Sequence, residues 1–309
     1  MTQPQEPGPP DHCAAGRGAD PASSADRASD DTGRTDEPRR ISRRSLMVGG
    51  VLGLGAVVAA GAVALPHLPF SLRHRLGLTA DPAIPDVPAG RVTLEQVYSH
   101  ARNKTVDLFT AVPAGYGDGA GLPVVVVLHG ATGRPDQYAG FGLPQFLTAA
   151  VQAGTPPFAL AGADGGTLFW SPQPDGDDPG AMVLDEMPRW LAARGFDAAT
   201  RALWGWSMGG YGVLNLSEQQ PGWARATAAF SPAVSEGDQV FASSSRLRPR
   251  DLGIWCGTDD PLYPSVRALA DSLRPAPAIA SFSPGGHTRV YWNDQTAAAF
   301  AFLGGRLAG

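Results

Sequence analysis

Residues 202–212 read Ala-Leu-Trp-Gly-Trp-Ser-Met-Gly-Gly-Tyr-Gly, and this stretch decides the fold. Gly205 and Gly209 flank Ser207 at the spacing of a sharp turn that carries a nucleophile between a strand and a helix. The apolar run over residues 202–204 predicts a buried strand before this turn. Residues 213–219 have helical character and stop before a proline. We therefore expect Ser207 to be exposed at the tip of a strand–turn–helix unit, where it can act as a nucleophile.

The rest of the chain alternates short apolar runs with helical segments. Two runs, 91–98 and 105–112, alternate apolar and polar residues and predict half-buried antiparallel strands. The predicted buried strands are 123–128, 158–163, 227–230, 252–256 and 279–282, and the predicted helices are 146–153, 181–194, 265–273 and 295–307. This alternation predicts an α/β fold, with a mostly parallel central sheet and helices on both faces.

A serine hydroxyl needs a neighbouring base, and the base needs a carboxylate to orient it. In folds built around such a turn the chain order is serine, acid, histidine. His287 is the only histidine after Ser207, and it lies in a Gly-rich loop between a predicted strand and a predicted helix. Two candidate acids follow the 252–256 strand. We favour Asp260 over Asp259, which could instead cap a turn or a helix.

Two backbone N–H groups are expected to stabilise the anion that forms on the substrate. One is the amide of Met208, directly after the serine. The other should come from the loop after the 123–128 strand, which begins His129-Gly130-Ala131. We assign this donor to Ala131, with Gly130 as the alternative, and interpret His129 as a structural residue that holds the loop.

Aromatic residues near these loops predict the substrate-binding surface. The loops before residues 181 and 252 lack the length and the apolar periodicity of a separate lid domain, so we expect an open cleft. Flat rings there suit a short acyl group, an aromatic group or a sugar ring, although each ring could instead be core or scattered surface. The expected substrate-binding residues are Gly130, Phe169, Trp170, Trp206 and Tyr211, with Tyr263 and Trp292 also at the cleft edge.

Four motifs together resemble the esterase D-like branch of the α/β-hydrolases. They are Leu-His-Gly at 128–130, the turn at 205–210, Gly-Thr-Asp-Asp-Pro at 257–261 and Gly-His at 286–287. The aromatic run at 167–170 and the Leu-Asp-Glu-Met-Pro segment at 184–188 are also similar. That branch includes S-formylglutathione hydrolases, feruloyl and acetyl esterases, and mycobacterial mycolyltransferases.

The resemblance covers residues 90–307 and implies an α/β-hydrolase fold without a large lid domain. It also implies a catalytic triad of Ser207, Asp260 and His287 acting on a carboxylic ester. The segment 257–260 looks like that of the hydrolases, whereas mycolyltransferases carry a glutamate in a different loop. This departure weakens the transferase interpretation.

The N-terminal part of the chain resembles an export signal. Residues 1–46 are polar, predict a disordered segment and include Arg43 and Arg44 near their end. An uncharged, weakly hydrophobic run follows over 47–65. A twin arginine in this position is typical of twin-arginine signals and implies the twin-arginine translocase as a partner. Cleavage near residue 64 and retention as a membrane anchor both stay open. Five prolines over 66–90 predict a linker, which leaves 91–309 as the catalytic domain.

Composition excludes several other classes. The chain has 309 residues and a net charge of −5, which argues against a nucleic-acid partner. Cys256 is the only cysteine after the apolar run, so the exported body has no intramolecular disulfide, and this thiol should pack as a small hydrophobe. No cluster of residues has metal-ligand spacing, and we expect no metal and no cofactor.

Three functions fit these observations. The first is an exported serine esterase, secreted or held in the cell envelope, that hydrolyses an acyl, aryl or sugar ester. The second is a cell-envelope acyltransferase of the mycolyltransferase or diacylglycerol acyltransferase kind, in which an alcohol replaces water. The third is a non-catalytic envelope-binding protein on a hydrolase scaffold. A complete set of catalytic motifs argues against the third, and we favour the first.

Overall fold

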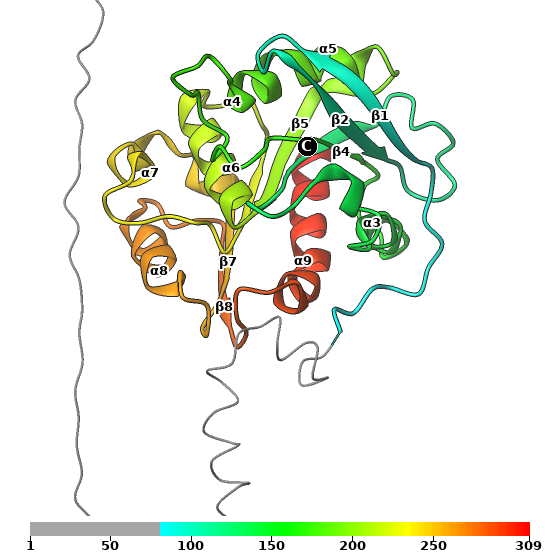
Figure 1. Ribbon diagram of the computed structural model, residues 1–309. Helices are drawn as coiled ribbons and strands as arrows, with labels where there is room; N and C mark the ends of the chain where they lie inside the picture. Colours follow the sequence, from blue (N-terminus) through cyan, green and yellow to red (C-terminus); the bar gives the residue numbers. More distant parts are fainter. Residues whose placement is uncertain (1–80) are drawn as a thin grey trace, which may run out of the picture. The chain divides into compact units, whose positions relative to one another are not determined.

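An eight-stranded sheet organises residues 81–309, the part of the chain that the computed structural model describes (Figure 1). Its strands lie in the order β1-β2-β4-β3-β5-β6-β7-β8. The first pairs, β1 with β2 and β2 with β4, are antiparallel, and all the others are parallel. The strands are β1 Val92–Ser99, β2 Lys104–Ala111, β3 Pro123–Leu128, β4 Ala159–Ala163, β5 Asp197–Trp206, β6 Thr227–Phe230, β7 Leu252–Gly257 and β8 Ile279–Ser283.

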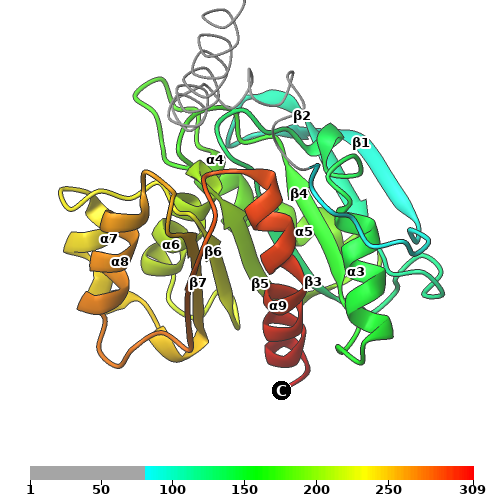
Figure 2. The same cartoon turned by 90° about the horizontal axis from the view of Figure 1, so that it is seen from below.

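Helices cover both faces of the sheet. Helices α3 (Leu143–Gln152) and α9 (Arg289–Ala308) lie side by side against one face, as Figures 1 and 2 show. Helices α5 (Met187–Ala192), α6 (Met208–Gln219) and α8 (Tyr263–Ser272) pack on the other. Shorter elements complete this layer: α4 Pro179–Ala181, the π-helical turn η3 Met182–Glu186, α7 Gln239–Ala242 and the 3₁₀ turns η4 Ser244–Arg246 and η5 Pro249–Asp251. A further 3₁₀ turn, η2, spans Pro135–Gln137. The predicted α/β-hydrolase architecture is therefore confirmed.

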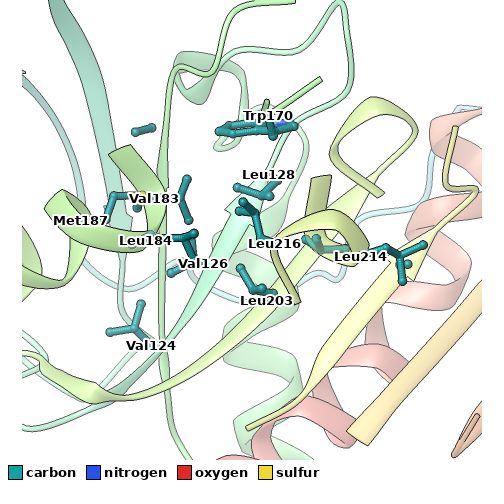
Figure 3. Close-up of a cluster of buried hydrophobic side chains, with 14 of the residues drawn as sticks. Val124, Val126, Leu128, Trp170, Val183, Leu184, Met187, Leu203, Leu214 and Leu216 are labelled. Atoms are coloured by element: carbon teal, nitrogen blue, oxygen red, sulfur yellow. The ribbon is translucent and has the colours of Figure 1, made fainter. Parts of the chain in front are cut away.

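Strand β3 is covered on both faces, which is why its sequence is a continuous apolar run. Val124, Val126 and Leu128 point into the core under α6, where Figure 3 shows them near side chains of α6 and of β5. Val125 and Val127 point to the opposite face and pack with α3 and α9. Because side chains alternate along a strand, a strand covered on both faces must be apolar at every position.

Helices α3, α6, α8 and α9 all begin earlier than the sequence pattern predicts, and the difference is largest for α6 and α9. Helix α6 begins at Met208 rather than at 213. Its first residues include Gly209, Gly210 and Gly212, which add no apolar side chains to a helical pattern. Helix α9 begins at Arg289 rather than at 295, and the Thr288 hydroxyl accepts from Tyr291 N–H at its start. The predicted helix over 181–194 is broken by the π-helical turn directly before Pro188. A proline cannot complete the regular helical bond to the preceding turn, so a wider turn is favoured there.

The predicted signal segments, 1–46 and 47–65, lie outside the described residues, as does the first part of the predicted linker. The described part of that linker packs against the body. The Asn293 amide donates to the carbonyl of Ala83 at 2.9 Å, and Ile84 lies against Gly142. Among residues 81–309, no helix is both long enough and apolar enough to cross a membrane.

Candidate active site

Four loops converge where the parallel strands end. Ser207 follows β5, and the 129–133 loop follows β3. Asp260 and His287 follow β7 and β8. Because these four strands are parallel, their carboxyl ends lie at one edge of the sheet, which is where open α/β sheets bind ligands. Residues far apart in the sequence are brought together by this topology alone.

Ser207 occupies a strained turn that the surrounding backbone holds in place. Its φ of 57° and ψ of −120° are rare for a residue with a side chain. Its N–H donates to Phe230 O at 2.9 Å, and its carbonyl accepts from the N–H groups of Tyr211 and Ala233, each at 3.0 Å. A methyl group at Gly209 would collide with the Leu128 carbonyl, so the turn can form only with glycine there. This turn places the Ser207 hydroxyl within reach of His287.

The three predicted catalytic side chains form a continuous hydrogen-bonded chain. His287 Nε2 lies 2.9 Å from Ser207 Oγ, and His287 Nδ1 lies 2.8 Å from Asp260 Oδ2. A carboxylate can only accept, so Nδ1 carries the imidazole proton and Nε2 is left to accept from the serine hydroxyl. The side chain of Asp260 is fully buried, whereas that of His287 is 30% exposed. The arrangement can therefore draw a proton from Ser207 towards His287.

Asp260 is held as a carboxylate. Burial on its own would raise the pKa of Asp260, but hydrogen bonds from His287, from Leu262 N–H and from the Ser231 hydroxyl lower it below its ordinary value. The Leu262 N–H lies 2.9 Å from Asp260 Oδ1. Asp259, the competing acid, is exposed and accepts from Gly285 N–H at 3.3 Å. The structure thus brings Asp260 to the imidazole and leaves Asp259 on the neighbouring loop.

The two predicted oxyanion-hole donors are the N–H groups of Ala131 and Met208. The carbonyl oxygen in each of these two peptide groups, that of Gly130 or Ser207, accepts hydrogen bonds that fix the orientation of the peptide. The Gly130 carbonyl accepts from Gly133 N–H at 2.9 Å and from His129 Nδ1 at 2.8 Å. The Ser207 carbonyl is held by the two bonds described above. In a trans peptide the N–H points opposite to the C=O, so the amides of Ala131 and Met208 point away from these partners. Gly130 and Ala131 line the same cleft as Ser207.

His129 is structural, as expected for a residue that holds this loop. It is fully buried, and its Nε2 accepts from Gly165 N–H at 3.0 Å. With Nε2 an acceptor, Nδ1 must carry the proton that it donates to Gly130. Trp170 packs edge-on against the imidazole, with ring centroids 5.0 Å apart.

An open cleft of about 570 Å³ surrounds Ser207 and His287. The 129–133 loop forms one side, and the beginning of α9 forms another. Trp206 and Trp292 contribute its aromatic surface, with ring centroids 6.4 Å apart. Its remaining lining residues are Asp81, Pro82, Thr132, Thr288 and Arg289.

Several expected substrate-binding residues lie elsewhere. The expectation that Trp170 edges the cleft is wrong, because this side chain is fully buried and its indole N–H donates to the carbonyl of His129. Phe169 is 45% exposed and packs edge-on against Tyr211, but neither is among the residues that line the cleft. Tyr263 packs against Phe282 in the same way. Gly130, Trp206 and Trp292 do line it.

Sequence reasoning missed several residues that belong to this region. Asp81 and Pro82 line the cleft from the predicted linker, and no local signal identifies them. Ser231 is buried, accepts from Trp292 Nε1 at 3.0 Å and lowers the pKa of Asp260. Arg289 lies two positions after His287, the predicted base, and this closeness in the sequence could have identified it.

No other chemistry-bearing group competes with this cleft in the described residues. Cys256 is fully buried in β7, and burial raises the pKa of its thiol to about 12, so it does not form a thiolate nucleophile. No group of three or more His, Cys, Asp or Glu side chains within residues 81–309 is placed to hold a metal ion.

The fold and the family match support one class of protein, the serine hydrolases that act on carboxylic esters. The family described as "Putative esterase" matches residues 178–303 of the chain. The match confirms the predicted resemblance to the esterase D-like branch. No curated protein sequence matches the chain.

Solved structures support the same fold. A ferulic acid esterase superposes with a TM-score of 0.59 at 19% identity, covering 71% of this chain and 100% of that one. An S-formylglutathione hydrolase from Agrobacterium tumefaciens gives 0.58 at 14% identity, with 71% and 96% covered. The fluorophosphonate-binding serine hydrolase F of Staphylococcus aureus gives 0.57 at 16% identity, with 70% and 99% covered. At these identities the likeness establishes the fold alone.

Proposed function

We propose that this protein hydrolyses a carboxylic ester through an acyl-enzyme intermediate on Ser207. The observation that carries the proposal is the hydrogen-bonded chain from Ser207 through His287 to Asp260, with distances of 2.9 and 2.8 Å. In this role Ser207 is the nucleophile, His287 the general base and Asp260 the group that orients the imidazole and stabilises its charged form.

The proposed steps use these three side chains and the two backbone amides in turn. His287 Nε2 takes the hydroxyl proton as Ser207 Oγ forms a bond to the ester carbon. The carbonyl oxygen becomes an anion, which the N–H groups of Met208 and Ala131 stabilise. When the bond to the alcohol oxygen breaks, His287 returns the proton to the departing alcohol. Water then attacks the acyl-enzyme with His287 again as base, and the acid leaves as Ser207 regains its proton.

Labelling with a fluorophosphonate tests the nucleophile directly. The adduct should map to Ser207 by mass spectrometry, and Ser207→Ala should abolish labelling and lower kcat by several orders of magnitude. The circular dichroism spectrum of the variant should match that of the parent. Labelling at another residue, or none on folded protein, argues against the proposal.

A hydrolase and an acyltransferase differ in the molecule that accepts the acyl group from Ser207. Water and an alcohol use the same catalytic groups, so product analysis with trehalose or diacylglycerol present separates them. We propose water as the acceptor, in line with the hydrolase-like segment at 257–260. Free acid should remain the main product when either alcohol is added, and acylated alcohol as the main product would favour the transferase.

Export is part of the same proposal. It rests on Arg43 and Arg44 before the apolar run 47–65, all outside the described residues. The twin-arginine translocase would carry the folded enzyme across the membrane, so the enzyme would act outside the cytoplasm. The segment 47–65 would be either removed or kept as an anchor.

A further inference from the structure

Arg289 brings a positive charge to the catalytic cleft. It lines the same cleft as Ser207 and His287, and it is the first residue of α9. A cation is unfavourable at a helix N-terminus, because the helix dipole is positive there. The helix dipole therefore does not favour an arginine at this position.

The guanidinium of Arg289 has unmet hydrogen-bonding capacity. Its Nε is buried and has no hydrogen-bond partner within the described residues. Its Nη2 donates to the Gly140 carbonyl at a long 3.4 Å, and the group lies 4.0 Å from the centre of the Phe141 ring. Burial lowers the pKa of Arg289 from its ordinary value, although a guanidinium stays charged at any pH near neutral.

No carboxylate in the described residues neutralises this charge. Arg289 takes part in none of the ion pairs found among residues 81–309. Asp81 is the acidic residue that lines the same cleft, and its side chain is exposed to solvent rather than paired with the guanidinium. A partly desolvated cation on a cleft, without a carboxylate partner, is the arrangement that a bound anion completes.

We propose that Arg289 binds an anionic oxygen group, a carboxylate or a phosphate, carried by the ester that Ser207 attacks. The proposal rests on the esterase function above and names its substrate class. Arg289 is then a specificity residue: it contacts the substrate away from the reacting bond and favours charged esters over neutral ones of the same size.

Two matched substrate pairs test this assignment and locate the anion. The first pair, 4-nitrophenyl hydrogen adipate and 4-nitrophenyl hexanoate, differs by a carboxylate on the acyl side. The second pair, 4-acetoxybenzoate and its methyl ester, differs by a carboxylate on the alcohol side. The readout is the ratio of kcat/KM for the charged and the neutral ester. In at least one pair the ratio should exceed one and fall about tenfold or more in Arg289→Gln, as for one charge-assisted hydrogen bond.

Matched controls separate substrate recognition from a structural role. Arg267 also lies over a phenylalanine ring, at 5.2 Å, but it is on α8 and outside the cleft, so Arg267→Gln should leave the ratio unchanged. Arg289→Lys should retain part of the preference. In the unsubstituted protein the ratio should fall as NaCl rises, because salt screens the pair.

The outcomes are distinct for the two proposals. If Arg289→Gln lowers the rates of both esters equally in both pairs, or if the unsubstituted protein shows no charged preference in either, Arg289 is a structural link between α9 and the 139–142 loop. If none of the four esters is cleaved, the esterase function itself is wrong.

Discussion

Trp292 packs edge-on against the imidazole of His287, with ring centroids 5.0 Å apart and an angle of 85° between the rings. The indole N–H of Trp292 donates to Ser231, and the Ser231 hydroxyl lowers the pKa of Asp260. His287 therefore contacts Asp260 on one side and Trp292 on another, and Ser231 accepts a hydrogen bond from Trp292. These contacts with Asp260 and Trp292 hold the imidazole of His287 in place, although His287 lies on a loop.

The two aspartates of the 257–261 segment should differ sharply in their effect on turnover. Asp260→Asn presents an amide to His287, which favours the tautomer with the proton on Nε2, facing Ser207. We expect kcat to fall by about 10³- to 10⁴-fold, as for other triads of this kind. Asp259→Asn should cost less than tenfold, because Asp259 contacts only the backbone of Gly285. Steady-state rates on 4-nitrophenyl acetate check both, and a larger loss in Asp259→Asn would reverse the assignment.

Glu218 should make the protein less stable as the pH rises. It is 2% exposed on α6, and neither of its carboxyl oxygens has a partner within the described residues. Burial raises its pKa from 4.5 to about 8, and nearby Arg246 only partly opposes this. The folded state then keeps a proton that the unfolded state has lost, so the free energy of unfolding falls between these two pH values.

Glu218→Gln removes this dependence. Relative to the parent, the variant should gain roughly 1.4 kcal/mol in unfolding free energy for each pH unit between about 4.5 and 8. Urea unfolding at pH 5, 6.5 and 8 measures the difference. Glu236→Gln, at an exposed position, is the control and should show no such trend. A constant difference at all three pH values would mean that Glu218 is ionised in the folded state.

Short esters should be better substrates than long ones. The cleft is open, and the described residues include no lid domain that would cover a long acyl chain. We expect kcat/KM to fall from acetyl and butyryl to palmitoyl esters of 4-nitrophenol. The rate should also rise smoothly through the micelle threshold of the longer esters. A preference for palmitoyl, or a jump in rate at that threshold, would instead indicate a lipase or a lipid acyltransferase.

The twin arginine should be required for export. Changing Arg43 and Arg44 together to Lys should leave the precursor in the cytoplasm, measured by cell fractionation and immunoblotting. The chain offers its own control, because Arg39 and Arg40 form a second pair nearby. Replacing that pair with Lys should leave export intact. Export of the Arg43/Arg44 variant would contradict the assignment, and an N-terminus near Leu65 in the mature protein would show cleavage rather than anchoring.

The sequence was sufficient to predict which chemical groups the strand ends would bring together. Ser207 and His287 stand in motifs whose glycines and chain order are dictated by local backbone geometry. Choosing Asp260 over Asp259 needed only the spacing from the strand end. Parallel topology then brings such residues to one edge of the sheet, whatever the details of the packing.

Side-chain direction in the loops was not predictable in the same way. Trp170 lies in a segment without periodicity, and its burial depends on contacts with His129 and the first turns of α6. The early start of α9 combines the local Thr288 cap, which the apolar pattern does not include, with a bond from Asn293 to the distant Ala83. Arg289 faces the cleft only because α9 begins there. The burial of Trp170 and the contact of Asn293 with Ala83 are long-range contacts, which no local pattern records.

The buried imidazole of His129 determines when the 129–133 loop becomes ordered. One ring joins the loop after β3 to the loop after β4, through Gly130 on one side and Gly165 on the other. The conformational entropy of residues 129–133 is therefore lost when the chain folds, and not when an ester arrives. Binding energy from the ester is then available for positioning the reacting carbonyl, because the loop that receives it is already rigid.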